Sequence, residues 1–214
     1  MRDVEEVIRD LILHRAGIIR TLSGGTWSHF GNYFYIQEKY LKSDLDEEFR
    51  RRFCAYYVMN GARGLNKPQQ SRYFKLLAAL ETNLKKALRT LFAVPGYGRR
   101  HKLFLSFTTK LLHTVDGKLP IYDGNIAHVL VLPKQISTVP LEEKIENRIA
   151  IYGELRRWFR ASLKSPEVNR YLREMRALLR GAARKDHFEW KDNLLSDTKL
   201  LDSCLWALYS VLNK

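Results

Sequence analysis

Hydrophobic residues recur along this chain at the three- and four-residue intervals of an α-helix. The longest such series runs through Leu76, Leu77, Leu80, Leu84, Leu88 and Leu91. Apolar side chains at this spacing share one face of a helix, whereas a half-buried strand would alternate apolar and polar residues. Alternating segments are scarce here, so the sequence predicts an all-α fold.

Glycine and proline residues, which interrupt helices and favour turns, divide the chain into expected elements. Helices are expected over 2–15, from Asp44 onward, from Pro68 to about residue 92, over 99–115, from Asp123, and over 141–162, 166–183 and 196–212. Asp44 and Glu47 have capping-box spacing, and Pro68 suits a first helical turn. A length of 214 residues favours one domain, 1–214. We expect two helical lobes with a cleft between them, formed by 1–60 plus 132–214 and by 61–131.

Positive charge is in large excess. Lys and Arg number 37 against 23 Asp and Glu, a formal net charge of +14. Such an excess indicates a polyanionic partner, either nucleic acid or an acidic membrane surface. One expected helix carries a one-sided series of arginines, namely Arg170, Arg173, Arg176, Arg180 and Arg184. We interpret this stripe as a track for DNA phosphates, with Arg173 and Arg180 as contacts; the alternative is an ordinary solvated face.

The chain shows no sign of export or membrane insertion. No apolar run approaches the roughly 20 residues that span a bilayer. The first ten residues, "MRDVEEVIRD", carry acids where a signal peptide would be basic and then apolar. We therefore expect a cytoplasmic protein. Cys54 and Cys204 are the only cysteines and lie far apart, which predicts reduced core residues rather than a metal site.

The segment "VPGYG", residues 94–98, separates two expected helices. Gly96 and Gly98 permit the positive φ of a sharp turn, which can aim backbone N–H groups outward at an anion. The cations that would strengthen phosphate binding are Arg99, Arg100, His101 and Lys102. The alternative is a simple interhelical turn with solvated charges.

A lone acid, Asp123, stands in "KLPIYDGNIAHVL" at the start of a short apolar helix. An aspartate there caps the helix, which contributes about 1 kcal/mol, and the helix dipole favours its ionised form. Lys110 lies among apolar residues in the preceding helix. A lysine in a dry pocket can lose its proton and attack an electrophile, whereas a surface lysine would extend its amine into water.

The order helix, "VPGYG", helix, "LPIYD", helix resembles the helix-hairpin-helix DNA glycosylase superfamily. The phrase "FTTKLLHTVDGKLPIYDGNIAHVL" is similar to a bacterial branch with the 8-oxoguanine DNA glycosylase fold, and "DTKLLDSCLWAL" resembles the closing helix of that branch. The similarity covers 94–131 and 197–208; elsewhere it extends only to helix order. Lyases of the superfamily place their lysine just after the hairpin, where this chain has Arg100, with Lys102 two residues on.

The resemblance implies a DNA glycosylase that flips a base out of duplex DNA and cleaves its N-glycosidic bond, leaving an abasic site. Asp123 would stabilise the cationic sugar of the transition state. Lys110 would be either a pocket residue or the Schiff-base nucleophile of a lyase. Neither a catalytic metal nor a cofactor is implied, although the superfamily includes members with a structural monovalent cation at the hairpin.

Further site residues follow from the needs of base flipping, which leaves a gap to plug and a base to hold. The loop after residue 60 offers Arg63, Asn66 and Gln69 as a plug, or is a plain interhelical loop. The expected base pocket comprises His113, Tyr122 and Trp206. Trp27, Phe30 and Tyr33 are further candidates for aromatic pocket walls, although most aromatic residues of this chain are more typical of a core. His128 is a candidate phosphate contact.

The branch suggests two kinds of modified base. One is a hypermodified phage base, such as glucosylated hydroxymethylcytosine, removed in bacterial antiphage defence; we favour it because the hairpin lysine is displaced. The other is 8-oxoguanine, removed in DNA repair. Two other classes of function are also consistent with the sequence. The chain would then be a non-enzymatic helical DNA- or RNA-binding module, or a regulatory protein that binds an acidic partner. No obligate protein partner and no membrane are expected.

Overall fold

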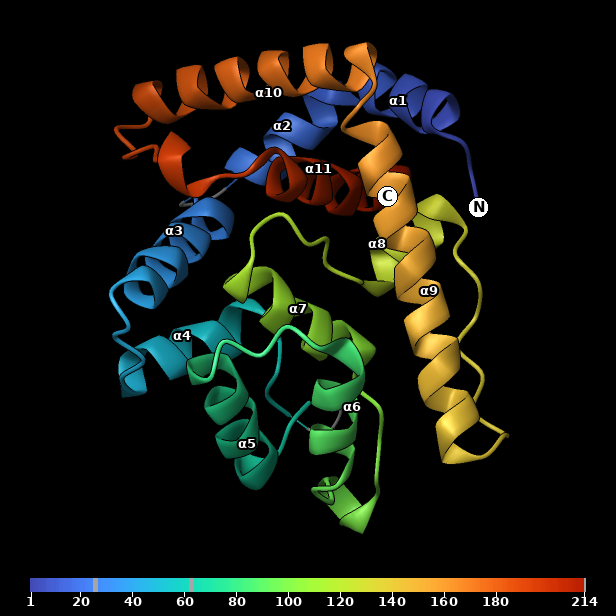
Figure 1. Ribbon diagram of the computed structural model, residues 1–214. Helices are drawn as coiled ribbons and strands as arrows, with labels where there is room; N and C mark the ends of the chain where they lie inside the picture. Colours follow the sequence, from blue (N-terminus) through green and yellow to red (C-terminus); the bar gives the residue numbers. More distant parts are fainter. Residues whose placement is uncertain (25–26, 62–63, 214) are drawn as a thin grey trace.

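The computed structural model of the chain describes residues 1–24, 27–61 and 64–213. Within these ranges the chain forms eleven α-helices, two short 3-10 helices and no strand, which confirms the all-α class (Figure 1). The elements are α1 (Val4–Leu13), α2 (Arg15–Ser23), α3 (Ser28–Leu41), α4 (Glu47–Tyr56), α5 (Lys67–Ala78), α6 (Leu84–Phe92), η1 (Tyr97–Arg99), α7 (Leu105–Val115), α8 (Gly124–Leu130), α9 (Leu141–Ser162), α10 (Pro166–Lys185), η2 (Asp192–Leu194) and α11 (Asp197–Leu212). None of these helices is both long and apolar enough to cross a membrane.

Helix α11 occupies the centre of the molecule. It packs against α2 and α8, and also against α1 and α10 (Figure 1). Helices α1, α2 and α10 lie at one end of the molecule and α4 to α7 at the other. Helix α9 runs alongside both groups (Figure 1). The buried apolar side chains form one large continuous cluster, with a small satellite of Leu88, Leu103 and Ile145. Both ends of the molecule therefore share a single core.

The C-terminal helices lie close to their expected positions. The expected spans 141–162, 166–183 and 196–212 correspond to α9, α10 and α11. Serine side chains cap the last two, because Ser165 accepts from the N–H of Val168 and Ser196 from that of Lys199. A serine at this position satisfies one of the free N–H groups of the first turn.

The expected helix from Pro68 to residue 92 is interrupted. Helix α5 ends at Ala78 and α6 begins only at Leu84. Leu80 fits the apolar spacing but adopts the left-handed region, with φ of 53°. Asn83 then caps α6 by accepting from the N–H of Lys86 at 3.0 Å. The side-chain cap therefore fixes the start of α6, and hydrophobic spacing alone did not reveal the break.

Two other expected boundaries are also corrected. Asp46, not Asp44, caps α4, since its side chain accepts from the N–H of Phe49 at 2.7 Å, while Asp44 pairs with Lys39. The expected helix 99–115 begins only at Leu105. Both expected buried cysteines are confirmed: Cys54 and Cys204 are free and buried.

Candidate active site

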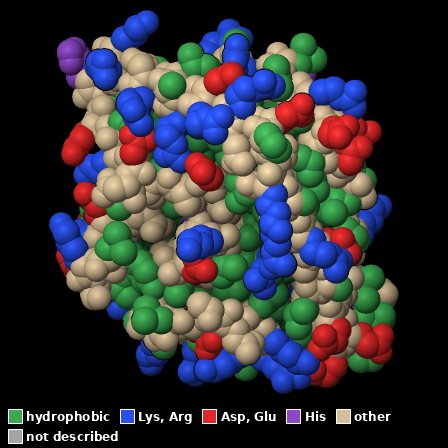
Figure 2. All heavy atoms as spheres, turned by 45° about the horizontal axis from the view of Figure 1, so that its top comes forward, with side chains coloured by type: hydrophobic (Ala, Val, Ile, Leu, Met, Phe, Trp, Pro, Cys, Tyr) green, Lys and Arg blue, Asp and Glu red, His purple; other side chains and the backbone are tan. Residues whose placement is uncertain are grey.

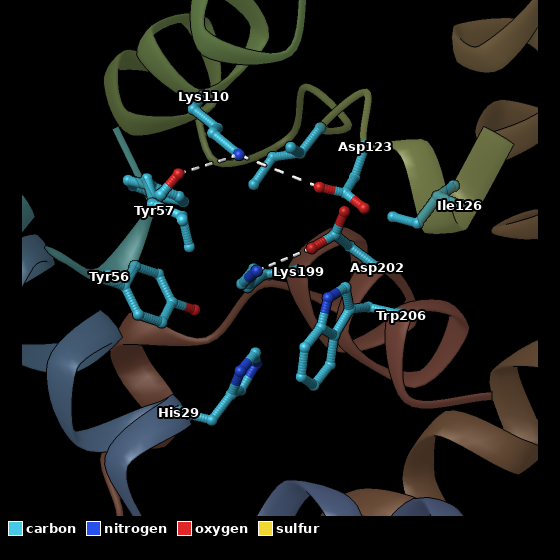
Figure 3. Close-up of a pocket in the computed structure, with 11 residues that line it drawn as sticks. His29, Tyr56, Tyr57, Lys110, Asp123, Ile126, Lys199, Asp202 and Trp206 are labelled. Atoms are coloured by element: carbon cyan, nitrogen blue, oxygen red, sulfur yellow. Dashed lines mark hydrogen bonds and ion pairs between the residues drawn. The ribbon is translucent and has the colours of Figure 1, made fainter. Parts of the chain in front are cut away.

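A cavity of about 140 Å³ lies where α7, α8 and α11 face the ends of α3 and α4. Four charged residues line it: Lys110, Asp123, Lys199 and Asp202. Figure 3 shows Lys110 and Asp123 on one side, and Lys199 and Asp202 with Trp206 on the other. Two lysine–aspartate pairs therefore face each other across one small space.

Lys110 projects from α7 into surroundings that are largely apolar. Its side chain is 10% exposed, and its Nζ lies about 5.5 Å from two ring centres, 5.6 Å from that of Tyr57 and 5.4 Å from that of Phe107. The ammonium donates to the Tyr57 carbonyl at 3.3 Å and lies 3.9 Å from a carboxylate oxygen of Asp123. Burial lowers the pKa of Lys110, and the nearby carboxylates only partly oppose the effect. A lysine in this environment yields its proton more readily than one in water.

Asp123 is the N-cap of α8. Its Oδ1 accepts from the N–H of Asn125 at 2.9 Å, and its Oδ2 is the oxygen nearest Lys110. The preceding segment is tied to α7, because the N–H of Tyr122 donates to Thr109 Oγ1 at 3.0 Å. Pro120 is held in turn by its carbonyl, which accepts from the Tyr152 hydroxyl at 3.0 Å. These contacts fix the carboxylate at the rim with one oxygen directed into the cavity.

Lys199 and Asp202 form an almost fully buried ion pair on α11, with 2.7 Å between Nζ and Oδ2. Burial lowers the pKa of Lys199, but the Asp202 carboxylate together with Tyr57 and Tyr33 more than offsets this, so the pKa is raised. Lys199 therefore keeps its proton, whereas Lys110 is disposed to lose it. Sequence reasoning missed Lys199; the available signal was a charged pair at positions i and i+3 inside the apolar segment "DTKLLDSCLWAL".

Aromatic rings line the remaining walls of the cavity. The rings of His29 and Trp206 stack, with centroids 5.5 Å apart and planes at 20°. Burial lowers the pKa of His29 to about 3, so its imidazole is neutral at pH 7. Among described residues, the hydroxyls of Tyr56 and Tyr57 and Oδ1 of Asp202 are buried without a hydrogen-bond partner. All three atoms belong to residues that line the cavity.

Of the expected pocket residues, Trp206 lines the cavity and His113 and Tyr122 do not. His113 is fully buried behind it, 2.6 Å from the Leu119 carbonyl through Nδ1 and 3.2 Å from the Tyr33 hydroxyl through Nε2. A carbonyl only accepts, so Nδ1 carries the proton and Nε2 accepts from Tyr33. The Tyr122 hydroxyl accepts from Gln135 Nε2 at 3.0 Å. Both side chains are therefore hydrogen-bonded to protein groups and lie outside the cavity lining.

The other candidate wall residues, Trp27, Phe30 and Tyr33, lie in the core and do not line the cavity. Trp27 stacks on Phe188, with ring centroids 5.0 Å apart, while Phe30 and Tyr33 are almost wholly inaccessible. His128 is exposed on α8, packs edge-on against Tyr209 and does not line the cavity. Its expected phosphate contact stays a prediction.

The buried imidazole of His113 should make the fold sensitive to acid. Burial lowers its pKa from 6.5 to about 3, so below pH 6.5 the unfolded chain binds a proton that the folded chain does not. This imidazole alone should therefore lower the free energy of unfolding by about 1.4 kcal/mol per pH unit as the pH decreases from about 6.5 toward 3, and His29, whose pKa burial also lowers to about 3, should add a similar slope. Urea denaturation across this range measures the slope. His113→Gln should reduce it and His128→Gln should not; an equal slope in all three proteins would contradict the assignment.

The 94–98 segment forms a tight turn, with Gly98 at φ of 64° and the N–H of Gly96 donating to the Arg100 carbonyl at 2.8 Å. The expected phosphate contacts Arg99, Arg100 and Lys102 are exposed, and none forms an ion pair with a described residue. Because α7 begins only at Leu105, the expected anion site at a helix N-terminus directly after the glycines does not form.

The expected plug residues have a different role. Asn66 caps α5 and donates to the Pro95 carbonyl at 2.9 Å. Gln69 is fully buried, completes the capping box and donates to the Val94 carbonyl at 2.9 Å. These amides hold the turn against α5, so Gln69 is not available to DNA. Arg63 lies outside the described residues.

The arginine stripe on α10 is partly neutralised. Arg176 pairs with Asp192 and Asp197, and Arg180 with Asp192 at 2.5 Å. Arg173 is exposed and has no ion-pair partner among the residues that the structure describes. Figure 2 shows Lys and Arg side chains gathered over the upper part of the face turned forward, where α10 lies. The surface is basic, but Arg180 is less free for phosphate than the sequence suggested.

Residues 1–24, 27–61 and 64–213 contain no group of three or more His, Cys, Asp and Glu side chains arranged to hold a metal ion. Comparison with protein-family models, with curated proteins and with solved structures found no match to this chain.

Proposed function

We propose that this chain is a DNA glycosylase of the helix-hairpin-helix type, which takes a flipped modified base into the cavity and cleaves its N-glycosidic bond. The observation that carries the proposal is the meeting of Lys110 and Asp123, 3.9 Å apart, at a cavity with aromatic walls. Breaking a glycosidic bond places positive charge on the sugar, which a fixed carboxylate stabilises. The succession of α6, the 94–98 turn, α7 and the α8 cap supports the superfamily assignment.

The cavity suits an extruded base. A flat ring can stack on Trp206 or on the tyrosines, as a flipped base requires. Tyr56, Tyr57 and Asp202 line the cavity and carry the hydroxyl donors and the carboxylate acceptor that recognition of the edge of a base requires. At about 140 Å³ the space lies below the ~300–1,000 Å³ of common ligand pockets. It therefore favours a single base, and a glucose substituent would have to project outside.

Two chemical routes are open to this pair. In the first, water attacks C1′ as the bond to the base breaks; Asp123 stabilises the cationic sugar, and the base departs with the bonding electrons and takes up a proton. In the second, the neutral amine of Lys110 attacks C1′, the base departs, and the adduct rearranges to a Schiff base that permits strand cleavage. The lowered pKa of Lys110 supports the second route.

A base-release assay tests the proposal directly. Wild-type protein is incubated with duplexes that contain 8-oxoguanine and with phage DNA that contains glucosylated hydroxymethylcytosine, and free base and alkali-labile sites are measured. Release from either substrate supports a glycosylase and identifies its base class, repair or antiphage defence. If no base is released from either, while duplex DNA is still bound, the chain is a non-enzymatic helical DNA-binding module instead.

Borohydride trapping distinguishes the two routes. If Lys110 is the nucleophile, wild type forms a covalent protein–DNA adduct and Lys110→Gln does not. Lys102→Gln, which alters the lysine nearest the hairpin, should still form it. Adduct formation should increase with pH and level off above the lowered pKa of Lys110, because only the neutral amine attacks. Base release without an adduct in wild type would identify the water route.

The exposed cations that follow the 94–98 turn should bind DNA phosphates without sequence specificity. Arg100→Ala should weaken duplex binding equally for all sequences and reduce the slope of log K against log salt by about 0.9. Arg51→Ala removes the same charge at a site already paired with Glu48, so its slope should stay closer to wild type. Fluorescence anisotropy at several salt concentrations measures both; equal slopes in the two variants would exclude the hairpin contact.

A further inference from the structure

Val58 stands at the rim of the cavity with its side chain in solvent. It follows α4 directly after Tyr56 and Tyr57, lines the cavity with them, and is 76% exposed. An apolar side chain this open at the mouth of a polar cavity gains nothing from the protein core. Its exposure leaves it free to contact a partner at the mouth of the cavity.

The backbone at Val58 is one that glycine would adopt more easily. The N–H of Val58 donates to the Ala55 carbonyl at 3.2 Å, and that of Met59 donates to the Cys54 carbonyl at 2.8 Å. This is the Schellman pattern that ends many helices, in which the left-handed residue is usually glycine. Val58 occupies that position with φ of 53°, an uncommon and costly conformation for a β-branched residue.

Backbone conformation alone does not distinguish Val58. Leu80 and Val131 also adopt positive φ at helix ends, with φ of 53° and 52°, and are likewise exposed. Val131 has the same hydrogen-bond pattern, since its own N–H donates to His128 and that of Leu132 to Ala127. Of these three residues Val58 alone lines the cavity. Val131 is therefore a close structural control.

The residues on either side hold Val58 firmly. The Tyr57 carbonyl accepts from Lys110 at 3.3 Å, so the chain just before Val58 is tied to the proposed nucleophile. Met59 is fully buried, and its carbonyl accepts from the N–H of Leu65 at 2.8 Å. A small apolar side chain is thus presented outward from a fixed point between two anchored residues.

We propose that Val58 enters duplex DNA and fills the space left by the flipped base. The inference rests on the proposed function and names its partner as duplex rather than single-stranded DNA. Proteins that open a base step commonly insert an apolar side chain, which replaces part of the lost stacking. Val58 adjoins the cavity that would receive the base, whereas Gln69, expected to serve as a plug, is buried.

The test uses a short duplex with one tetrahydrofuran residue, a stable analogue of the abasic product, and 2-aminopurine beside it. Val58→Gly should weaken binding to this duplex by at least about tenfold, equivalent to about 1.4 kcal/mol, and suppress the change in 2-aminopurine fluorescence. Binding to the same strand without its complement should be unchanged. Val131→Gly should match wild type in every measurement. Neither variant should lower the melting temperature, since glycine suits both backbones.

The outcomes separate this inference from the proposed function. If Val58→Gly binds the tetrahydrofuran duplex as tightly as wild type, or loses affinity for duplex and single strand alike, the inserted-residue role is wrong even when wild type releases base. If wild type releases no base but Val58→Gly still shows the duplex-specific loss, the enzyme proposal fails and the insertion stands as a property of a DNA-binding protein.

Discussion

Replacing Asp123 by asparagine should reduce the rate of base release by about 10²–10³-fold, the loss typical when a group that stabilises transition-state charge is removed. Asparagine caps helices about as well as aspartate, so the start of α8 and the free energy of unfolding should change little. Single-turnover release from the best substrate of the panel measures the rate, and urea denaturation measures the stability.

The matched control is Asp3→Asn. Asp3 caps α1 through the N–H of Glu6 at 2.7 Å, as Asp123 caps α8, but it lies outside the cavity. It should release base at the wild-type rate. If Asp123→Asn retains full activity, Asp123 is only a helix cap and the enzyme proposal loses its central residue. If both variants lose activity together, the loss is a general effect of removing a capping carboxylate and does not depend on the position of Asp123 in the cavity.

Replacing Lys199 by methionine should lower the free energy of unfolding by about 3–5 kcal/mol, because it leaves the buried Asp202 carboxylate without its cation. The two side chains are 4% and 5% exposed, so water cannot readily replace the lost partner. Typical domains are stable by only about 5–15 kcal/mol, so the variant should unfold at a much lower urea concentration. Equilibrium urea denaturation gives the value.

The double variant Lys199→Met with Asp202→Leu should recover most of this stability, since it removes both buried charges. It should not recover activity, because Asp202 lines the cavity that is proposed to hold the base. A loss below about 1 kcal/mol in the single variant would mean that the pair behaves as an exposed one. Recovery of activity in the double variant would exclude a role for Asp202 in holding the base.

Sequence reasoning predicted the C-terminal helices well because local signals mark their ends. Ser165 and Ser196 each stand at an N-cap, and the proline after Ser165 occupies the first turn. The break between α5 and α6 was missed for the opposite reason. Leu80 continues the apolar spacing, and no glycine or proline marks the residue at which the chain turns left-handed. Periodicity reports which faces are buried, not whether the helix between them is continuous.

The site was predicted in part. Lys110, Asp123 and Trp206 do meet at one cavity, although Trp206 is far from the other two in sequence. Asn66 and Gln69 were assigned to DNA, yet their three-residue spacing is itself a capping-box signal, and the structure shows that box. Lys199 and the Tyr56–Tyr57 wall required knowledge of how α4 and α11 pack. Such long-range proximity cannot be inferred from local patterns.

The tie between α5 and the hairpin has a mechanical consequence. The Asn66 and Gln69 amides that begin α5 also hold the carbonyls of Pro95 and Val94, so turn and helix move as one body. The loop that precedes α5 is anchored in turn by the Leu65–Met59 hydrogen bond, one residue from Val58. In the proposed complex, the protein would therefore hold its two DNA contacts at a fixed distance from each other. The distance between the phosphate bound at the 94–98 turn and the base step opened at Val58 would be the same for every base that the protein tests along the DNA.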